Sequence, residues 1–260
     1  MDVNNALIGY SGFVGSILLK QSDFKSLYRS TNISEIKNKT FDTVVCAAAP
    51  AVKWLANKEP EQDKQSINSL IAHLSTIKCK TFILISTVDV FKDSSEVVES
   101  TPVNIAGLHP YGLHRYQLEE FVKKNFPHHL IVRLPGLVGP GLKKNVIYDF
   151  LNNNNLEAID SRGVFQFYPM VNLWSDIQVA ISNNCSLIHL TSEPISVQEI
   201  AEQCFNFHFK NQLANEPAIY DFRTEFAYLY SRTGEYQYAK KEAFLAIRSY
   251  AQSENKKECS

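Results

Sequence analysis

Short apolar runs alternate with stretches of helical periodicity along the first half of the chain. Four runs are rich in β-branched residues and lack the alternation of a strand with one exposed face: residues 6–9, 42–49, 81–87 and 129–136. Runs of this kind are typical of strands buried on both faces of a parallel sheet. Residues 26–30 form a weaker candidate strand. The pattern therefore predicts a parallel sheet.

Between the runs, apolar residues recur at the three- and four-residue spacing of a helix. One such face extends from Ile67 to Ile77, and the next from Leu118 to Val122. Strands that alternate with helices through right-handed crossovers give an α/β fold. We therefore predict a Rossmann-like, doubly wound parallel sheet.

The strand–helix pattern loosens after about Gly136, where we expect a small C-terminal α/β lobe. The predicted core comprises residues 1–136 and 171–192, the lobe comprises 137–170 and 193–252, and residues 253–260 form a polar tail. Within the lobe, the asparagines at 152–155 predict a loop. Ser196 and Glu199 have the spacing of a capping box at a helix start, and a final helix is expected at about 240–251.

Charge and composition exclude several classes of protein. The net charge of -1 argues against nucleic-acid binding, which needs clustered basic charge. The five cysteines lack CxxC spacing and the seven histidines form no HxxxH or HExxH arrangement, so we expect reduced thiols and no metal. No apolar run approaches the ~20 residues of a membrane span. We expect a cytoplasmic protein without a signal peptide, because the first predicted strand begins at once.

Three glycines separate the first predicted strand from the first predicted helix. Gly9 permits a sharp turn, Gly12 lets backbone approach a phosphate, and Gly15 lets the helix pack closely on the sheet. Amides at a helix N-terminus attract a pyrophosphate. The GxxGxxG spacing differs from the commonest fingerprint, GxGxxG, and also suits a purely structural turn. We favour nucleotide binding by the turn, with contacts from Gly9, Ser11, Gly12, Phe13, Val14 and Gly15.

The end of the second predicted strand distinguishes the two nicotinamide dinucleotides. An acidic residue there binds the ribose of NAD, whereas a basic one admits the phosphate of NADP. This chain offers Arg29 and Ser30 and no carboxylate. We therefore predict NADP, with NAD less favoured. The alternative is that Arg29 is an ordinary exposed arginine.

Two later segments carry polar side chains suited to catalysis. The strand at 81–87 ends in Ser86 and Thr87, and Asp89 follows. Tyr111 opens a predicted helix, and Arg115 lies at i+4 on the same face. With the strand, glycine turn and helix upstream, this order resembles the short-chain dehydrogenase/reductase superfamily. More narrowly, it resembles the extended branch, the NAD-dependent epimerase/dehydratase family.

The resemblance extends over nearly the whole chain. Residues 44–49 resemble the segment that flanks the adenine, which implies cofactor contacts at Ala47 and Ala48. Residues 131–141 are similar to the strand and loop that lead to the substrate region, which implies a contact at Pro135. Residues 173–177 resemble the element at which the chain rejoins the core. Homodimers are common in the superfamily, so a homodimer is possible here.

The resemblance also implies the catalytic roles. Tyr111 would be the acid/base, Thr87 the hydroxyl that positions the substrate oxygen, with Ser86 as the alternative. The family has a lysine four residues after the tyrosine, and Arg115 stands there as the ribose-binding, charge-stabilising residue. Because the pKa of free tyrosine is about 10, it needs a nearby cation to ionise near neutrality. An arginine keeps the charge but has a larger, planar head, so the exchange is not conservative.

Two further departures concern the reaction and the substrate. Dehydratases of the family carry Thr-Asp-Glu at the strand end, whereas this chain has Thr87-Val88-Asp89, so dehydration is not expected. Asp89 is either a lone acid or base or a carboxylate that caps a turn. Gly136 stands where many nucleotide-sugar enzymes of the family have an asparagine that contacts the substrate phosphate, which counts against a nucleotide-sugar substrate.

The last third of the chain is rich in aromatic residues. Most of them are expected to form the core of the lobe, and Gln166, Tyr168 and Arg223 are candidate substrate contacts. The combined prediction is an NAD(P)-dependent oxidoreductase or epimerase that acts on a sugar, nucleotide-sugar or similar polyol or ketone. The alternatives are a non-catalytic NAD(P)-binding sensor or scaffold, and a degenerate Rossmann fold kept as a protein-interaction surface.

Overall fold

The computed structural model describes residues 4–254 of the 260-residue chain. These residues form two compact units. The first contains residues 4–93, 99–134 and 174–189, and the second contains 94–98, 135–173 and 190–254. Most of the predicted polar tail, with Cys259, lies outside the described residues.

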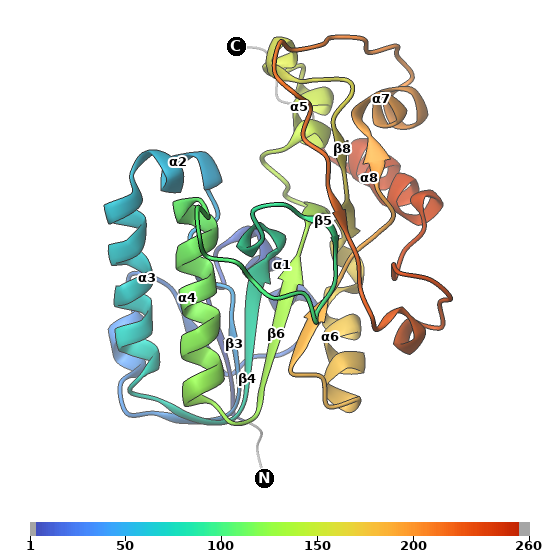
Figure 1. The fold of residues 1–260 in the computed structure, drawn as a ribbon. Helices are drawn as coiled ribbons and strands as arrows, with labels where there is room; N and C mark the ends of the chain where they lie inside the picture. The colour runs from blue at the N-terminus through green and yellow to red at the C-terminus, as the bar shows by residue number, and fades with distance from the viewer. Residues whose placement is uncertain (1–3, 255–260) are drawn as a thin grey trace. The chain divides into compact units, whose positions relative to one another are not determined.

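Within the described residues, a parallel sheet of six strands forms the centre of the first unit (Figure 1). The strand order is β10–β6–β4–β3–β1–β2, and every neighbouring pair is parallel. This arrangement confirms the predicted sheet, to which the three-residue β10 is an addition. The strands are β1 (Asn5–Ile8), β2 (Ser26–Tyr28), β3 (Thr40–Cys46), β4 (Lys78–Thr87), β6 (His129–Leu134) and β10 (Leu187–His189).

Helices cover both faces of this sheet. On one face α3 (Pro60–Leu74) and α4 (Pro110–Asn125) lie side by side (Figure 1). The opposite face carries α1 (Phe13–Gln21), because right-handed crossovers in opposite directions place helices on opposite faces. There the amide of Trp174 in α6 (Leu173–Ser182) donates to Gln21 Oε1 at 3.0 Å. Shorter helices are α2 (Lys53–Lys58) and the 3-10 helices η1 (Ile33–Ile36) and η2 (Val88–Val90).

The apolar periodicity of α3 places its buried face against the sheet. Ile67 and Leu74 are fully buried, as predicted. The helix is shorter than the predicted face, because it ends at Leu74 and Ile77 is buried in the turn that leads to β4. Cys46 lies fully buried in β3, as expected of a small core residue.

The second unit is built from short strand pairs and three α-helices within the described residues. The segment 94–98 contributes β5, which pairs in parallel with a strand about 125 residues later in the chain. The pairs are β7 (Gly136–Val138) with β9 (Phe167–Pro169), β8 (Val164–Phe165) with β11 (Ile195–Ser196), and β5 (Ser95–Val97) with β12 (Asp221–Phe222). The helices are α5 (Val146–Asn152), α7 (Val197–Phe205) and α8 (Lys240–Ser253), with the 3-10 helices η3 (Leu156–Ala158), η4 (Met170–Asn172) and η5 (Ala227–Tyr230).

Local signals in the second unit give the predicted structures. Ser196 and Glu199 form a complete capping box at the start of α7. Asn153 and Asn155 adopt left-handed backbone with φ of 52° and 48°, so the asparagine run does end a helix in a turn. No helix among residues 4–254 combines the length and apolar character that a membrane crossing would require.

The strand order contains one topological switch point that bears on function. From β1 the chain passes to β2 on one side, and then crosses to β3 on the other side of β1. Ligands of open α/β sheets bind at the carboxyl ends of the strands where the order reverses. The glycine turn follows β1 at this point, and Ala47 follows β3.

Candidate active site

The glycine turn is tightly fitted to its neighbours at two of its three glycines. Gly9 has a φ of 87°, and its amide donates to the carbonyl of Tyr28 at 2.7 Å. A Cβ at Gly9 would lie 2.5 Å from the Ala47 carbonyl oxygen, and a Cβ at Gly15 would lie 2.0 Å from that of Gly9. The fold alone therefore requires glycine at both positions.

Gly12 is different, because nothing in the described structure requires glycine there. A Cβ at Gly12 would meet only the Gly9 carbonyl oxygen within 4 Å, at an ordinary 3.4 Å. Among the described residues no side chain caps α1, and its first turn holds no acidic residue. The amides of Phe13 and Val14 have no acceptor within the helix. With the exposed Ser11, this open turn fits the phosphates of a dinucleotide.

Other predicted cofactor contacts flank the switch point. Ala47 and Ala48 directly follow β3 and are partly exposed. Arg29 and Ser30 are exposed just after β2, and Arg29 Nε donates to Thr31 Oγ1 at 3.0 Å. Both ends of β2 and β3 thus present polar or small residues to solvent. Pro135 directly follows β6, and its proposed contact stays a prediction.

The start of α4 is anchored by two side chains. The amide of Tyr111 donates to Asn57 Oδ1 and that of Gly112 donates to His109 Nδ1, each at 3.0 Å. A Cβ at Gly112 would lie 2.0 Å from the carbonyl oxygen of Asp89 in η2. Glycine at this position therefore lets the start of α4 approach the end of β4.

This approach brings Tyr111 and Thr87 together. Thr87 is the last residue of β4, and its side chain is a hydrogen-bond partner of the Tyr111 hydroxyl. Asp89 lies beside them, with its amide donating to Thr87 Oγ1 at 3.2 Å. Lys53 Nζ in turn lies 2.6 Å from Asp89 Oδ1. Asp89 therefore caps the turn, as one of its two predicted alternatives required, while also forming an ion pair.

Arg115 is held by a carboxylate that the sequence analysis did not identify. Its guanidinium stacks on the Tyr111 ring, with Cζ 3.9 Å from the ring centroid, and the residue is only 2% exposed. Two of its nitrogens donate to Asp63 of α3 at 2.5 and 2.8 Å, and others reach the carbonyl oxygens of Tyr111 and Pro50. Its Nε has no partner among the described residues. Most of the side chain is thus occupied within the protein.

Asp63 connects two residues of α4. Besides Arg115, it contacts His114, whose Nδ1 lies 2.7 Å from Asp63 Oδ2. Burial alone would raise the pKa of Asp63, but the hydrogen bonds of Arg115 and His114 outweigh burial and hold this pKa below its ordinary range. Asp63 is therefore an ionised, buried anchor for α4.

Competing effects act on the ionisation of Tyr111. Burial raises its pKa above the ordinary value, and the Asp89 carboxylate acts in the same direction. The Arg115 guanidinium, the Thr87 hydrogen bond and the more distant Lys53 ammonium lower it. The net pKa is raised, so without a bound ligand Tyr111 is a protonated acid at neutral pH.

Ser86, the alternative hydroxyl, faces a different environment. Its Oγ donates to Glu119 Oε1 at 2.5 Å, and Glu119 is fully buried and pairs with Arg133 at 2.6 Å. The Ser86 hydroxyl therefore serves a buried ion pair between α4 and β6. Of the two predicted hydroxyls, Thr87 is the one beside Tyr111.

The predicted substrate contacts of the second unit are engaged in internal bonds. Gln166 is 1% exposed, and its amide nitrogen donates to Thr191 Oγ1 and to the carbonyls of Ser192 and Phe222, at 2.6–2.8 Å. Its oxygen accepts the Phe222 amide at 2.7 Å. Tyr168 is fully buried, with its ring edge-on to that of Tyr238. Neither side chain presents a free polar atom of its amide or ring edge to solvent in this unit.

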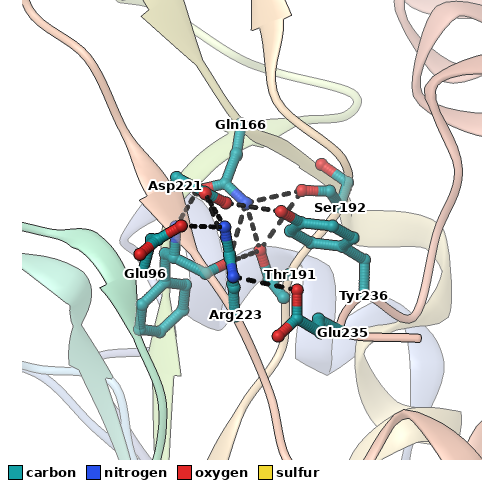
Figure 2. A network of polar contacts seen from close by, with 9 residues as sticks. Glu96, Gln166, Thr191, Ser192, Asp221, Arg223, Glu235 and Tyr236 are labelled. Carbon is teal, nitrogen blue, oxygen red and sulfur yellow. Dashed lines mark hydrogen bonds and ion pairs between the residues drawn. The ribbon is translucent and has the colours of Figure 1, made fainter. Parts of the chain in front are cut away.

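Arg223 is surrounded by carboxylates (Figure 2). It pairs with Asp221 at 2.6 Å, with Glu96 at 2.7 Å and with Glu235 at 3.0 Å. Tyr236 donates its hydroxyl proton to the other oxygen of Asp221 at 2.5 Å. These contacts join β5 to β12 and raise the pKa of Arg223. Arg223 therefore holds two distant segments together.

Sequence reasoning missed Lys53 and Asp63. Asp63 had one available signal: it shares a helix face with Ile67, Leu70 and Leu74, so it places a carboxylate on an apolar stripe. A charge at such a position needs a buried partner. Lys53 offered no such signal. Among the described residues, no three His, Cys, Asp or Glu side chains are grouped as a metal site would need.

Neither a protein-family model nor a curated protein sequence matches this chain. Solved structures do resemble it. A dTDP-4-dehydrorhamnose reductase from Clostridium acetobutylicum has 18% identity, with 96% of this chain and 99% of that one covered and a TM-score of 0.71. The same enzyme from Bacillus anthracis, in complex with NADP, has 18% identity over 98% and 99% of the two chains and a TM-score of 0.71.

An epimerase gives a similar match. UDP-glucuronic acid 4-epimerase from Bacillus cereus, in complex with NAD, has 17% identity over 96% and 98% of the two chains and a TM-score of 0.70. At such identities the likeness shows the fold. It confirms the Rossmann-like architecture and, at the level of the fold, the predicted resemblance to extended short-chain reductases and epimerases.

Proposed function

We propose that this protein is an NAD(P)-dependent reductase or epimerase that acts on a carbonyl or secondary alcohol of a sugar-like substrate. The observation that carries the proposal is the Tyr111–Thr87 pair at the end of β4, in the same unit as an open glycine turn at the switch point of the sheet. The turn suits a dinucleotide, and the pair suits proton transfer to or from an oxygen. The reductases and epimerases named above share this fold and support the same class of reaction.

Residues around the switch point would hold the cofactor. Gly12 and the first amides of α1 would receive the pyrophosphate, with Ser11 beside them, while Ala47 and Ala48 would flank the adenine. Arg29 and Ser30 favour the additional phosphate of NADP over the free ribose of NAD.

Tyr111 and Thr87 would carry out the proton chemistry. A bound nicotinamide supplies or accepts the hydride. Thr87 would hold the substrate oxygen by a hydrogen bond, and Tyr111 would donate a proton to this oxygen in reduction or remove one in oxidation. A protonated Tyr111 at neutral pH suits the donating direction, which favours carbonyl reduction as the first step.

Arg115 would stabilise charge on Tyr111. Its guanidinium lies against the ring and lowers the Tyr111 pKa against the effect of burial. Because Asp63 occupies two of its nitrogens, only the buried Nε remains for a ribose hydroxyl. We therefore assign Arg115 mainly an electrostatic role, in contrast to the ribose-binding lysine that the resemblance implies.

Two further observations narrow the reaction and the substrate. Val88 is buried within η2, so the position of the dehydratase acid holds an apolar core residue and water elimination is not supported. A Cβ at Gly136 would lie 2.6 Å from the Gln166 carbonyl oxygen, so the backbone leaves no room for an asparagine there. A free sugar or a similar polyol is therefore favoured at this position over a nucleotide sugar.

A titration of the purified protein with NADPH and NADH, followed by nicotinamide fluorescence, tests the cofactor site. We expect NADPH to bind more tightly, and Gly12→Val to weaken binding at least about tenfold, because its side chain would occupy the phosphate position. Gly141→Ala, at a turn with open space around it, is the matched glycine control. Unchanged NADPH affinity in Gly12→Val would refute the proposed pyrophosphate site.

Turnover of Tyr111→Phe tests the chemistry. The assay follows NADPH oxidation with dTDP-4-dehydrorhamnose and with a panel of free keto sugars. We expect Tyr111→Phe to lose activity by about 10²-fold or more while NADPH still binds, and Tyr116→Phe on the same helix to retain activity. Binding without any turnover in the wild-type protein would favour the alternative, an NAD(P)-binding sensor, which the occupied Arg115 also favours.

A further inference from the structure

A buried Tyr111 raises the question of how its proton is replaced. The residue is 8% exposed, so its hydroxyl exchanges poorly with bulk water. Its neighbour Arg115 offers no path, because a guanidinium does not lose its proton in proteins. Arg115 can stabilise charge on Tyr111, but it cannot pass a proton onward.

A series of polar groups leads from Tyr111 in another direction. The first is Thr87, hydrogen-bonded to Tyr111. Thr87 Oγ1 then lies 3.4 Å from Asp89 Oδ2, and Asp89 Oδ1 lies 2.6 Å from Lys53 Nζ. Exposure rises along the series, to 17% for the Asp89 side chain and 40% for that of Lys53. The buried hydroxyl is thus connected to solvent by groups that can exchange protons.

The chemistry of threonine suits this position. A hydroxyl can accept one hydrogen bond while it donates another, so it can take a proton on one side and release one on the other. When Tyr111 has given its proton to a substrate oxygen, the tyrosinate takes the Thr87 proton. Thr87 regains a proton from Asp89, and Asp89 regains one from water. No group is oxidised or reduced in this sequence.

We propose that Thr87 and Asp89 form the path by which Tyr111 exchanges its proton with solvent, and that Lys53 holds Asp89 in place at the exposed end. The inference rests on the proposed role of Tyr111 as the acid/base. It gives Asp89 a function that the absent dehydratase acid does not, and it explains how an arginine can stand where a proton-carrying lysine is expected.

One competing route starts at His109. Its ring centroid lies 6.3 Å from that of Tyr111, and its Nδ1 accepts the Gly112 amide. Burial lowers the pKa of His109, and the charge of Lys53 adds to this effect. The groups that face Tyr111 are therefore Arg115 and His109 from α4, Lys53 and Asn57 from α2, and Asp89 from η2. Arg115 and Asn57 cannot titrate near neutral pH, so His109 is the route to exclude.

Hydroxyl exchange of Tyr111 can be measured without a substrate. The full-length protein is labelled with 13C at the ζ carbon of tyrosine, and the hydrogen–deuterium isotope shift of that carbon is followed in mixed H2O and D2O. Tyr111→Phe assigns the signal. We expect Asp89→Asn to slow exchange at least about tenfold, in line with the contribution of a positioned proton-transfer group. Asp89→Ser serves as a second variant if Asp89→Asn fails to fold.

Variants of the neighbours distinguish the paths. Lys53→Met should slow exchange, whereas Lys53→Arg should restore it, because an arginine keeps the ion pair with Asp89. His109→Gln should leave exchange at the wild-type rate. Unchanged exchange in Asp89→Asn, or a larger loss in His109→Gln, would overturn the path. Equal losses in Lys53→Met and Lys53→Arg would overturn the holding role of Lys53.

Turnover separates this inference from the proposed function. If Asp89→Asn slows hydroxyl exchange but Tyr111→Phe leaves turnover intact, the role of Tyr111 fails while the path stands. If both variants lose turnover, added formate should partly restore Asp89→Asn and should not restore Tyr111→Phe. A purely structural loss in Asp89→Asn would not respond to formate.

Discussion

Two arginines of this protein, one in each unit, are ringed by carboxylates in opposite ways. Arg115 has one acidic partner, Asp63, and both side chains are almost fully buried. Arg223 has three acidic partners, yet its side chain is 21% exposed and Glu96 and Glu235 are largely exposed. Both arginines were predicted to bind ligands, and both are engaged by the protein itself.

The difference lies in the solvent and not in the number of partners. In water, ion pairs are screened and contribute little, whereas a buried charge that loses its partner is strongly destabilising. The single partner of Arg115 therefore matters more than the three of Arg223. The same contrast bears on function, because Arg115 retains an unpartnered Nε beside Tyr111 among the described residues, while Gln166 near Arg223 has every polar atom of its amide bonded internally.

Removing the carboxylate of Asp63 should produce the largest effect. Asp63→Ala would leave the guanidinium of Arg115 buried without its counter-charge, so we expect the free energy of unfolding to fall by about 3–5 kcal/mol. Urea denaturation measures this loss. Glu61→Ala, an exposed acid in the same turn of α3, should change it little. A loss below that of an ordinary surface substitution would show that Arg115 finds another partner and would break the comparison.

Acid should weaken the same interaction by a smaller amount, because a protonated Asp63 still forms a hydrogen bond. The pKa of Asp63 is held below its ordinary value of 3.8 in the folded state. Its contribution to stability is therefore fully present above that value and is lost as the pH falls through the lower, folded-state pKa. The stability difference between wild type and Asp63→Asn should be constant near neutral pH and should shrink in acid. A difference that grows in acid would contradict the assignment.

Much of the first unit could be predicted from the sequence because its signals are local. A strand buried on both faces is a short apolar run, and the glycine turn has fixed offsets from the strand and helix that flank it. The positions of Tyr111 and Thr87 followed from the same order, since each lies at the end of a predicted element.

The contacts that decide what these residues do are not local. Asp63 and Arg115 are 52 residues apart, and the segment that carries β5 meets β12 about 125 residues later. Nothing in the sequence around Arg115 or Arg223 states which carboxylates will be near them. The choice between Ser86 and Thr87 was also open, because it depends on Glu119 being fully buried beneath Ser86.

A substitution at Gln166 should have an intermediate effect on stability and none on the cofactor. Gln166→Met keeps the volume but leaves the Phe222 amide and two buried carbonyls without the Gln166 side chain, so we expect a loss of about 2 kcal/mol. NADPH affinity should stay unchanged. Gln198→Met, at an exposed position of α7, is the matched control. Weaker substrate binding in a stable Gln166→Met protein would instead support the predicted role of Gln166 as a substrate contact.

The smallest effect is expected at Arg223, and it sharpens the comparison most. Arg223→Met removes three ion pairs at once, yet all are open to solvent, so the loss should be about 1 kcal/mol or less. Salt should abolish most of this difference, because screening already weakens the wild-type pairs. Arg248→Met, an exposed arginine of α8, controls for the loss of a surface charge. If Arg223→Met were as destabilising as Asp63→Ala, the number of partners would matter more than their burial. If it instead left stability intact but raised the substrate KM, Arg223 would be a binding residue after all.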